Sequence, residues 1–162
     1  MGLSKQAVRS LVIEAFKDVR LGDGIGLWEG QGHDDYEDEM TIKKLREKDE
    51  KQDWHCISVE TLNRCESSLS FFDADGMRFH IAAFILADLD GKANCGPAYQ
   101  LTQLEWNRDK FSTLNQSQRV AIRRYLEQCL ESEGYEFEHD VIVNALSSFW
   151  KMTGCRLLQP NR

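Results

Sequence analysis

The chain has 162 residues and a formal net charge of −7 at pH 7, with 41% hydrophobic and 29% charged residues. This length and apolar content predict a single domain over residues 1–162, and they exclude disorder of the whole chain. The negative charge argues against nucleic-acid binding and against docking on anionic lipid, because both need a basic face, and it favours a basic protein partner.

No stretch approaches the ~20 apolar residues that a membrane-spanning helix needs, and no secretory signal is visible at the N-terminus. The cysteines are odd in number and widely spaced, which predicts reduced, mostly buried thiols: Cys56, Cys65, Cys95, Cys129 and Cys155. We therefore expect a cytoplasmic protein that does not enter a membrane.

The first expected element is an amphipathic helix over residues 5–19, in which apolar side chains recur every three or four positions and Ser4 is placed to cap the N-terminus. Three glycines at a spacing of two end this helix: Gly22, Gly24 and Gly26. They follow a helix rather than a strand, and no Lys-Ser or Lys-Thr pair comes after them, so they indicate a linker and not a phosphate-binding loop. We interpret residues 22–34 as a loop-rich connection.

The most polar part of the chain is residues 28–53, with acidic residues first and basic residues later. That order suits the helix macrodipole and predicts a helix over about 35–48. Its apolar side chains Tyr36 and Met40 are expected to face the body of the protein, and Trp54 is expected to return to the core.

The segment that follows a short predicted helix over 59–66 is compatible with two structures. Its apolar run, which comes after an aromatic pair and a turn, fits a short β-hairpin near residues 69–85, and it fits a buried helix over 76–88 equally well by periodicity. The length of the run and the alanine pair Ala82-Ala83 favour the helix.

The last third of the chain begins with residues 90–112, which predict a second loop-rich connection. Asn115 is then expected to cap a helix that runs to about residue 131, and a final helix is expected over 138–152. Together these elements predict a mainly α, single compact multi-helix domain.

The sequence contains no recognisable motif for metal binding or catalysis. Histidines adjoin acidic or thiol side chains at three places, but without the spacing that ligand pairs on a helix need: His33-Asp34, His55-Cys56 and His139-Asp140. No glycine-rich elbow frames a serine. We therefore expect no metal, no cofactor and no catalytic residue, and a small enzyme that uses Cys56 or His80 is the alternative.

Two segments carry a surplus of carboxylates. The first places five within six positions: Asp34, Asp35, Glu37, Asp38 and Glu39. The second has no lysine or arginine over residues 131–140 and also contains five: Glu131, Glu133, Glu136, Glu138 and Asp140. Because these carboxylates repel one another, a cationic partner would relieve the repulsion, and we expect both segments to bind a partner. A solvated helix start is the plain alternative for the first segment.

One stretch resembles a known family. It reads Arg78-Phe79-His80-Ile81-Ala82-Ala83 and is similar to the aromatic core of a family of small bacterial proteins known only as a domain of unknown function. Residues 114–122 and 13–16 are similar to the same family. The family core has proline where this chain has Ala82, and proline suits the first turn of a helix, so the resemblance favours the helix over 76–88. It implies no established activity and no catalytic residue.

Inhibitors of basic proteins are the functional class that this composition favours most. Bacterial immunity proteins against toxin nucleases cover a basic active site with carboxylates, which also speeds association. We expect this chain to be such an immunity protein, with residues 29–40 and 131–140 as its docking surface. A scaffold or a homo-oligomer subunit stays open as a further alternative.

Overall fold

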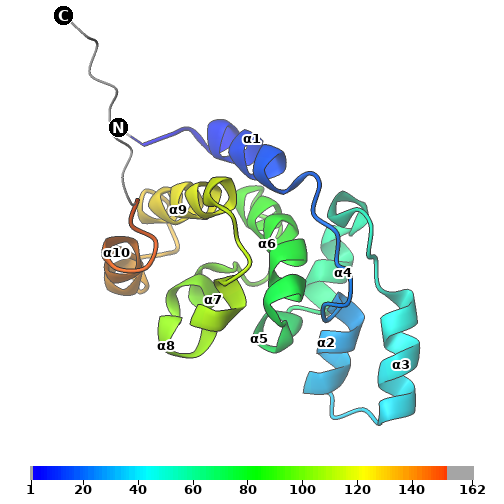
Figure 1. The fold of residues 1–162 in the computed structure, drawn as a ribbon. Helices are drawn as coiled ribbons and strands as arrows, with labels where there is room; N and C mark the ends of the chain where they lie inside the picture. The colour runs from blue at the N-terminus through cyan, green and yellow to red at the C-terminus, as the bar shows by residue number, and fades with distance from the viewer. Residues whose placement is uncertain (1, 153–162) are drawn as a thin grey trace, which may run out of the picture.

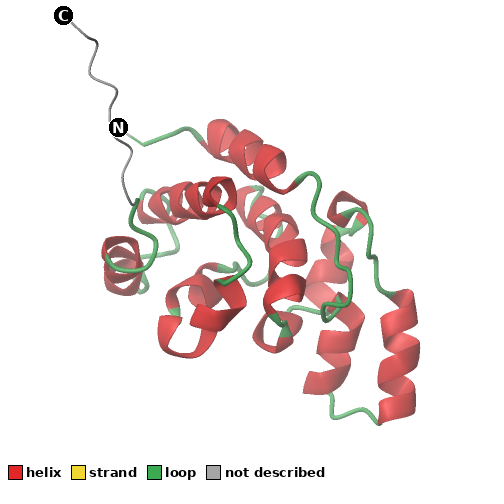
Figure 2. Cartoon of the chain, in the orientation of Figure 1, coloured by secondary structure: helices red, strands yellow, loops and turns green. Residues whose placement is uncertain are grey.

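Helices provide all the regular structure of residues 2–152, the part of the chain that the computed structural model describes (Figure 1, Figure 2). The predicted mainly α fold in one compact domain is confirmed. The β-hairpin considered near 69–85 is not formed, because those residues belong to two helices, α5 (Ser68–Phe71) and α6 (Ala74–Leu89).

The central element is α6, which other helices surround (Figure 1). Asp73 caps its N-terminus by accepting the backbone N–H of Gly76 at 2.8 Å. At its C-terminal end the chain turns at Gly91, whose positive φ of 66° favours glycine. Most side chains of α6 are buried, so the helix has no continuous polar face. For that reason its sequence lacks the helical periodicity that would have excluded a strand.

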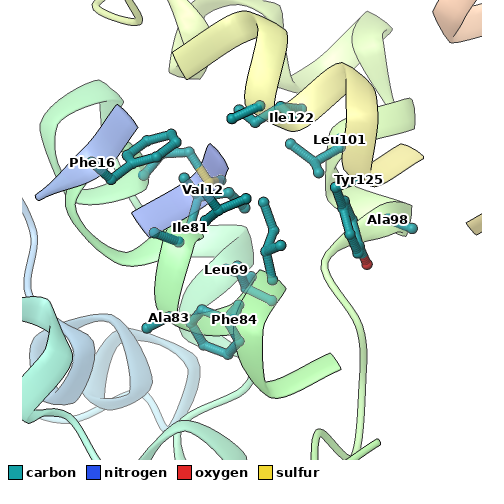
Figure 3. Packing of buried hydrophobic residues seen from close by; sticks show 14 of the residues in the cluster. Val12, Phe16, Leu69, Ile81, Ala83, Phe84, Ala98, Leu101, Ile122 and Tyr125 are labelled. Atoms are coloured by element: carbon teal, nitrogen blue, oxygen red, sulfur yellow. The ribbon is translucent and has the colours of Figure 1, made fainter. Parts of the chain in front are cut away.

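Two amphipathic helices cover α6. α1 (Lys5–Phe16) packs against both α6 and α9 (Gln116–Leu130), and Figure 3 shows Val12 and Phe16 of α1 beside Ile81 of α6. The predicted caps are present, since Ser4 accepts the N–H of Ala7 at 3.2 Å and Asn115 forms a capping box with Gln118. α1 ends three residues earlier than the sequence predicted.

The interpretation of residues 22–34 as a loop is wrong in its second half, where α2 (Leu27–Asp34) forms. The linker was predicted from Gly22, Gly24 and Gly26, which precede this helix. The two glycines inside the helix, Gly30 and Gly32, serve helix packing. A Cβ atom on Gly30 would lie 2.9 Å from the Ser68 Cβ of α5, and one on Gly32 would lie 2.5 Å from the Leu45 Cδ1 of the following helix, α3 (Glu39–Lys48). The glycines therefore allow helices to approach α2 on two sides.

The next helix, α3 (Glu39–Lys48), begins four residues later than predicted. The expectation that Tyr36 and Met40 face the body is also wrong, because 96% of Tyr36 and 70% of Met40 are exposed. The prediction for Trp54 is confirmed. This residue is buried in a short 3₁₀ helix (Trp54–Cys56), where its Nε1–H donates to the carbonyl of Phe16 at 2.9 Å.

The remaining helices complete the core. α4 (Val59–Arg64) agrees with the short helix predicted there. Residues 90–112 are not simply a loop, because they contain three short helices: α7 (Ala98–Thr102), α8 (Leu104–Asn107) and a 3₁₀ helix (Arg108–Phe111). α10 (His139–Ser147) stops five residues before the predicted end, and Trp150 then turns inward and donates its Nε1–H to the carbonyl of Leu101 at 2.8 Å.

Two global features of the described residues bear on function. Within residues 2–152 no helix is both long and apolar enough to cross a membrane. Four cysteines in this range carry free thiols; Cys65 and Cys129 are buried, whereas Cys56 and Cys95 are exposed, so burial holds for two of the four. Cys155 lies outside the described residues.

Candidate functional site

The first acidic segment forms the turn between α2 and α3, at the free end of a helical hairpin that projects from the body (Figure 1). α3 packs chiefly against α2 and contains no buried residue. We call residues 34–40 the hairpin tip. The surroundings of the tip are open, so its side chains are available to another molecule.

The base of the hairpin is held by a buried carboxylate and an ion pair. Asp49, which follows α3, accepts the backbone N–H groups of Trp28 and Glu29 at the start of α2, at 2.6 and 3.2 Å. Burial raises the pKa of the Asp49 carboxyl. Arg46 of α3 pairs with Glu29 of α2 and donates to the carbonyl of Gly24 at 2.7 Å. These contacts fix the orientation of the tip relative to the body.

Two of the five tip carboxylates have a role in the fold. Asp38 caps α3 by accepting the N–H of Thr41 at 2.8 Å, and this bond lowers the pKa of its carboxyl. Glu39 lies in the first turn of α3, where a negative charge suits the helix dipole. The fold therefore accounts for both residues without a partner.

The other three tip carboxylates cap no helix N-terminus, although Oδ1 of Asp35 accepts a hydrogen bond from Nε2 of Gln31 at 3.1 Å. Asp34 is the last residue of α2 and Asp35 is its C-cap, and a negative charge at a helix C-terminus is unfavourable by roughly 0.3–1 kcal/mol. Glu37 follows in the turn. Within the described part of the chain none of the five tip carboxylates forms an ion pair. Their charge is therefore directed at solvent or at a partner.

Tyr36 occupies an unusual backbone position at the centre of the tip. α2 ends in a Schellman motif, in which Glu37 N–H donates to the carbonyl of Gly32 at 3.0 Å and Tyr36 N–H to that of His33 at 3.3 Å. The motif places Tyr36 in the left-handed region, with φ of 57°, where glycine is usual. A bulky residue costs roughly 1–2 kcal/mol there, and its side chain makes no compensating buried contact because 96% of it is exposed.

The second acidic segment connects α9 to α10. Glu131 is the C-cap of α9. The carboxylate of Glu136 interacts with the backbone N–H of Glu136 itself and accepts the N–H of Gly134 at 3.0 Å, and these two backbone groups lower the pKa of the Glu136 carboxyl. Glu138 precedes α10, and the carboxylate of Asp140 lies 3.8 Å from the Nδ1 of His139. This segment also carries an exposed aromatic residue, Phe137, which is 98% exposed.

The structure does not bring the two acidic segments together. The hairpin tip and the α9–α10 connection lie at opposite ends of the molecule (Figure 1). One partner of ordinary size therefore cannot use both as a single continuous docking surface. Each segment has its own exposed aromatic residue, Tyr36 in the first and Phe137 in the second.

The residues considered for an enzyme are not set up for acid–base or thiolate chemistry near pH 7. His80 is buried in α6, stacks on Phe72 with ring centroids 4.4 Å apart, and has its pKa lowered to about 4 by burial. Cys56 is exposed, and the negative charge of Asp53 raises the pKa of its thiol. Among residues 2–152, no group of three His, Cys, Asp or Glu side chains could hold a metal ion.

Sequence reasoning missed one polar cluster. The hydroxyls of Tyr125 and Tyr135 both donate to Oδ2 of Asp88, at 2.8 and 2.5 Å, and they lie 3.4 Å from each other. The cluster joins α6, α9 and the α9–α10 connection, and it lines a cavity of about 230 Å³. No local spacing pattern signals it, because its residues are 10 to 47 positions apart.

The fold and its surface define an all-helical domain with a projecting acidic hairpin. The chain belongs to the family of unknown function DUF6714, whose sequence profile matches residues 4–153. No curated protein and no solved structure matches the chain. The membership agrees with the resemblance to a family of unknown function and brings no activity with it.

Proposed function

We propose that this protein is an acidic binding module that docks a basic partner protein at the hairpin tip, in the manner of an immunity protein that covers the active site of a nuclease-like toxin. The observation that carries the proposal is Tyr36: an exposed aromatic side chain in a strained backbone position, surrounded by carboxylates without ion pairs. Strain of this kind is a reason to look for function.

The charge at the tip supports a cationic partner. Within residues 2–152, Asp34 and Glu37 form no side-chain hydrogen bond or ion pair, and Asp35 accepts one hydrogen bond, from Gln31. Asp34 and Asp35 also oppose the dipole of α2. Complementary charge on a partner would remove this repulsion and would raise the association rate at low ionic strength. The net charge of −7 acts in the same direction.

The apolar side chains at the tip support direct contact with the partner and not only attraction at a distance. Tyr36 and Met40 are the exposed apolar residues of the hairpin tip. An aromatic residue surrounded by polar groups is the usual composition of an interface hot spot, in which the aromatic side chain enters a pocket and the rim excludes water. We therefore assign Tyr36 as the anchor and the carboxylates as the rim.

The described thiols are consistent with the proposed cytoplasmic location. Four cysteines are free, and free thiols persist in a reducing compartment. An immunity protein would act there, where it meets the toxin before the toxin reaches its substrate.

The experiment compares two matched charge reversals. The first candidate to test is the product of the neighbouring gene, and its affinity is measured by calorimetry at two salt concentrations. The double variant Asp35→Lys, Glu37→Lys should weaken binding at least about tenfold and reduce the salt dependence. The double variant Glu131→Lys, Glu133→Lys makes the same change in net charge at the other end of the molecule and should retain the affinity.

Equal affinities for the hairpin variant and the wild type would reject the hairpin tip as the docking surface. If only the variant of the α9–α10 connection lost binding, the partner would instead engage Glu131 and Glu133. Circular dichroism of both variants controls for folding, because all four substituted side chains lie on the exposed surface.

A further inference from the structure

The cavity beside Asp88 is lined mainly by hydrogen-bond acceptors. We propose that it binds an ammonium group, carried either by a small primary amine or by a lysine side chain of another protein. The cavity holds about 230 Å³ and lies where the last turn of α6, the C-terminal half of α9 and the α9–α10 connection meet. The proposal does not depend on the hairpin tip.

Asp88 provides the charge that would attract the ligand. Its Oδ2 already accepts two phenol hydroxyls, from Tyr125 and Tyr135. Its Oδ1 accepts no hydrogen bond from any donor in residues 2–152. Because each phenol directs its proton at Oδ2, the lone pairs of both phenol oxygens are left available as acceptors.

A further unsatisfied acceptor belongs to the same cavity. Gln128 lines it, and the Oε1 of Gln128 is buried without a hydrogen-bond partner. This oxygen is enclosed by the protein, so it adds negative potential near the cavity and is not itself counted as a contact for the ligand. Asp88 and Glu133 place two negative charges on the cavity wall against the one positive charge of Lys5. Both the hydrogen-bonding groups and the net charge therefore favour a cationic donor.

The hydrogen bonds that Asp88 already accepts favour an ammonium ligand over a guanidinium ligand. A guanidinium binds a carboxylate best with two parallel N–H bonds, one to each oxygen. Here Oδ2 of Asp88 is occupied by the two phenols, so only Oδ1 is free. An ammonium group is a compact charge with three donors that point in different directions, and it can use Oδ1 and a phenol oxygen as separate acceptors.

The backbone at Gly96 also packs against the cluster. A Cβ atom on Gly96 would lie 2.6 Å from both Oδ1 of Asp88 and the hydroxyl oxygen of Tyr135. The backbone of Gly96 therefore lies directly against these two acceptors, and any side chain at position 96 would displace them. Gly96 is not in the left-handed region, so its backbone conformation does not itself require glycine.

The test is calorimetric titration of the full chain with n-butylammonium chloride, with n-butanol as the neutral probe of similar size. We expect saturable millimolar binding of the cation and none of the alcohol. Asp88→Asn should weaken binding at least about tenfold, because it removes a charged partner, and Tyr135→Phe should weaken it about fivefold. Asp109→Asn and Tyr99→Phe are the matched controls at exposed positions and should bind as the wild type does.

Two arms separate the possible sources of the ammonium group. The peptide acetyl-Gly-Lys-Gly-amide is titrated beside acetyl-Gly-norleucyl-Gly-amide. Binding of the lysine peptide at the level of n-butylammonium supports a protein side chain as the ligand, whereas binding of n-butylammonium alone supports a free amine.

The proposal is overturned if the wild type shows no saturable heat with n-butylammonium, or if Asp88→Asn and Tyr135→Phe both bind it as the wild type does. Should Asp88→Asn lose its helical circular dichroism, Tyr135→Phe decides, since Tyr125 still holds the carboxylate in that variant. Neither result bears on the hairpin tip, so the two proposals can fail independently.

Discussion

The carboxylate of Asp49 accepts the backbone N–H of Trp28 at 2.6 Å, so the residue after α3 caps the helix before it. This bond joins two residues that are 21 positions apart in the sequence, and it closes the α2–α3 hairpin at its base. Gly26, at the N-cap position of α2, provides no side chain for this purpose. The position of the hairpin tip thus depends on the Asp49 carboxylate, which lies at the base of the hairpin just after α3.

Removal of this carboxylate should destabilise the protein. We expect Asp49→Ala to lower the free energy of unfolding by about 1–3 kcal/mol, because two partly buried backbone N–H groups lose their acceptor. Asp38→Ala removes an exposed cap of α3 and should cost less than Asp49→Ala does. Urea unfolding followed by circular dichroism measures both. A smaller loss for Asp49→Ala than for Asp38→Ala would contradict this role.

The strain at Tyr36 predicts opposite effects on stability and on binding. Tyr36→Gly should leave the free energy of unfolding unchanged or raise it by up to about 1 kcal/mol, because glycine adopts a φ of 57° without steric cost and the lost side chain is exposed. The same variant should weaken binding of the basic partner. Thermal unfolding gives the first quantity. A clear loss of stability would show that the tyrosine serves the fold.

Burial of His80 predicts a stability change with pH. Its pKa is lowered from 6.5 to about 4, so the unfolded chain takes up a proton at a higher pH than the folded one. The contribution of His80 is complete above pH 6.5 and is lost as the pH falls through about 4, with a magnitude on the order of 3 kcal/mol. In His80→Leu the unfolding free energy, measured in urea at several pH values, should depend less on pH in this window. Parallel profiles for the two proteins would disprove the assignment.

The thiols should differ sharply in reactivity. Burial raises the pKa of both Cys65 and Cys129 to about 12, so neither forms a thiolate near pH 7. Iodoacetamide should therefore label the exposed Cys56 and Cys95 in the folded protein and leave Cys65 and Cys129 unlabelled, as read by peptide mass mapping. Labelling in urea controls for peptide recovery. Fast labelling of Cys56 at the rate of an activated thiolate would revive the enzymatic alternative.

The sequence by itself determined the helical class, the caps and most helix positions. Ser4, Asn115 and the apolar spacing of α1 and α9 are local signals, because a cap or an amphipathic face needs only residues within a few positions of one another. The acidic surplus was equally visible, since charge is a property of composition.

Only the tertiary structure decided what the less regular segments became. Gly22, Gly24 and Gly26 predicted a loop to residue 34, but α2 forms from Leu27 and packs against α5 and α3 at Gly30 and Gly32. α6 lacked a periodic face because it is buried among other helices. The exposure of Tyr36 and the meeting of Asp88 with Tyr125 and Tyr135 likewise depend on contacts between distant residues. Local sequence patterns report on neighbours along the chain, whereas burial and side-chain clusters arise from neighbours in space, and for that reason the sequence left them undecided.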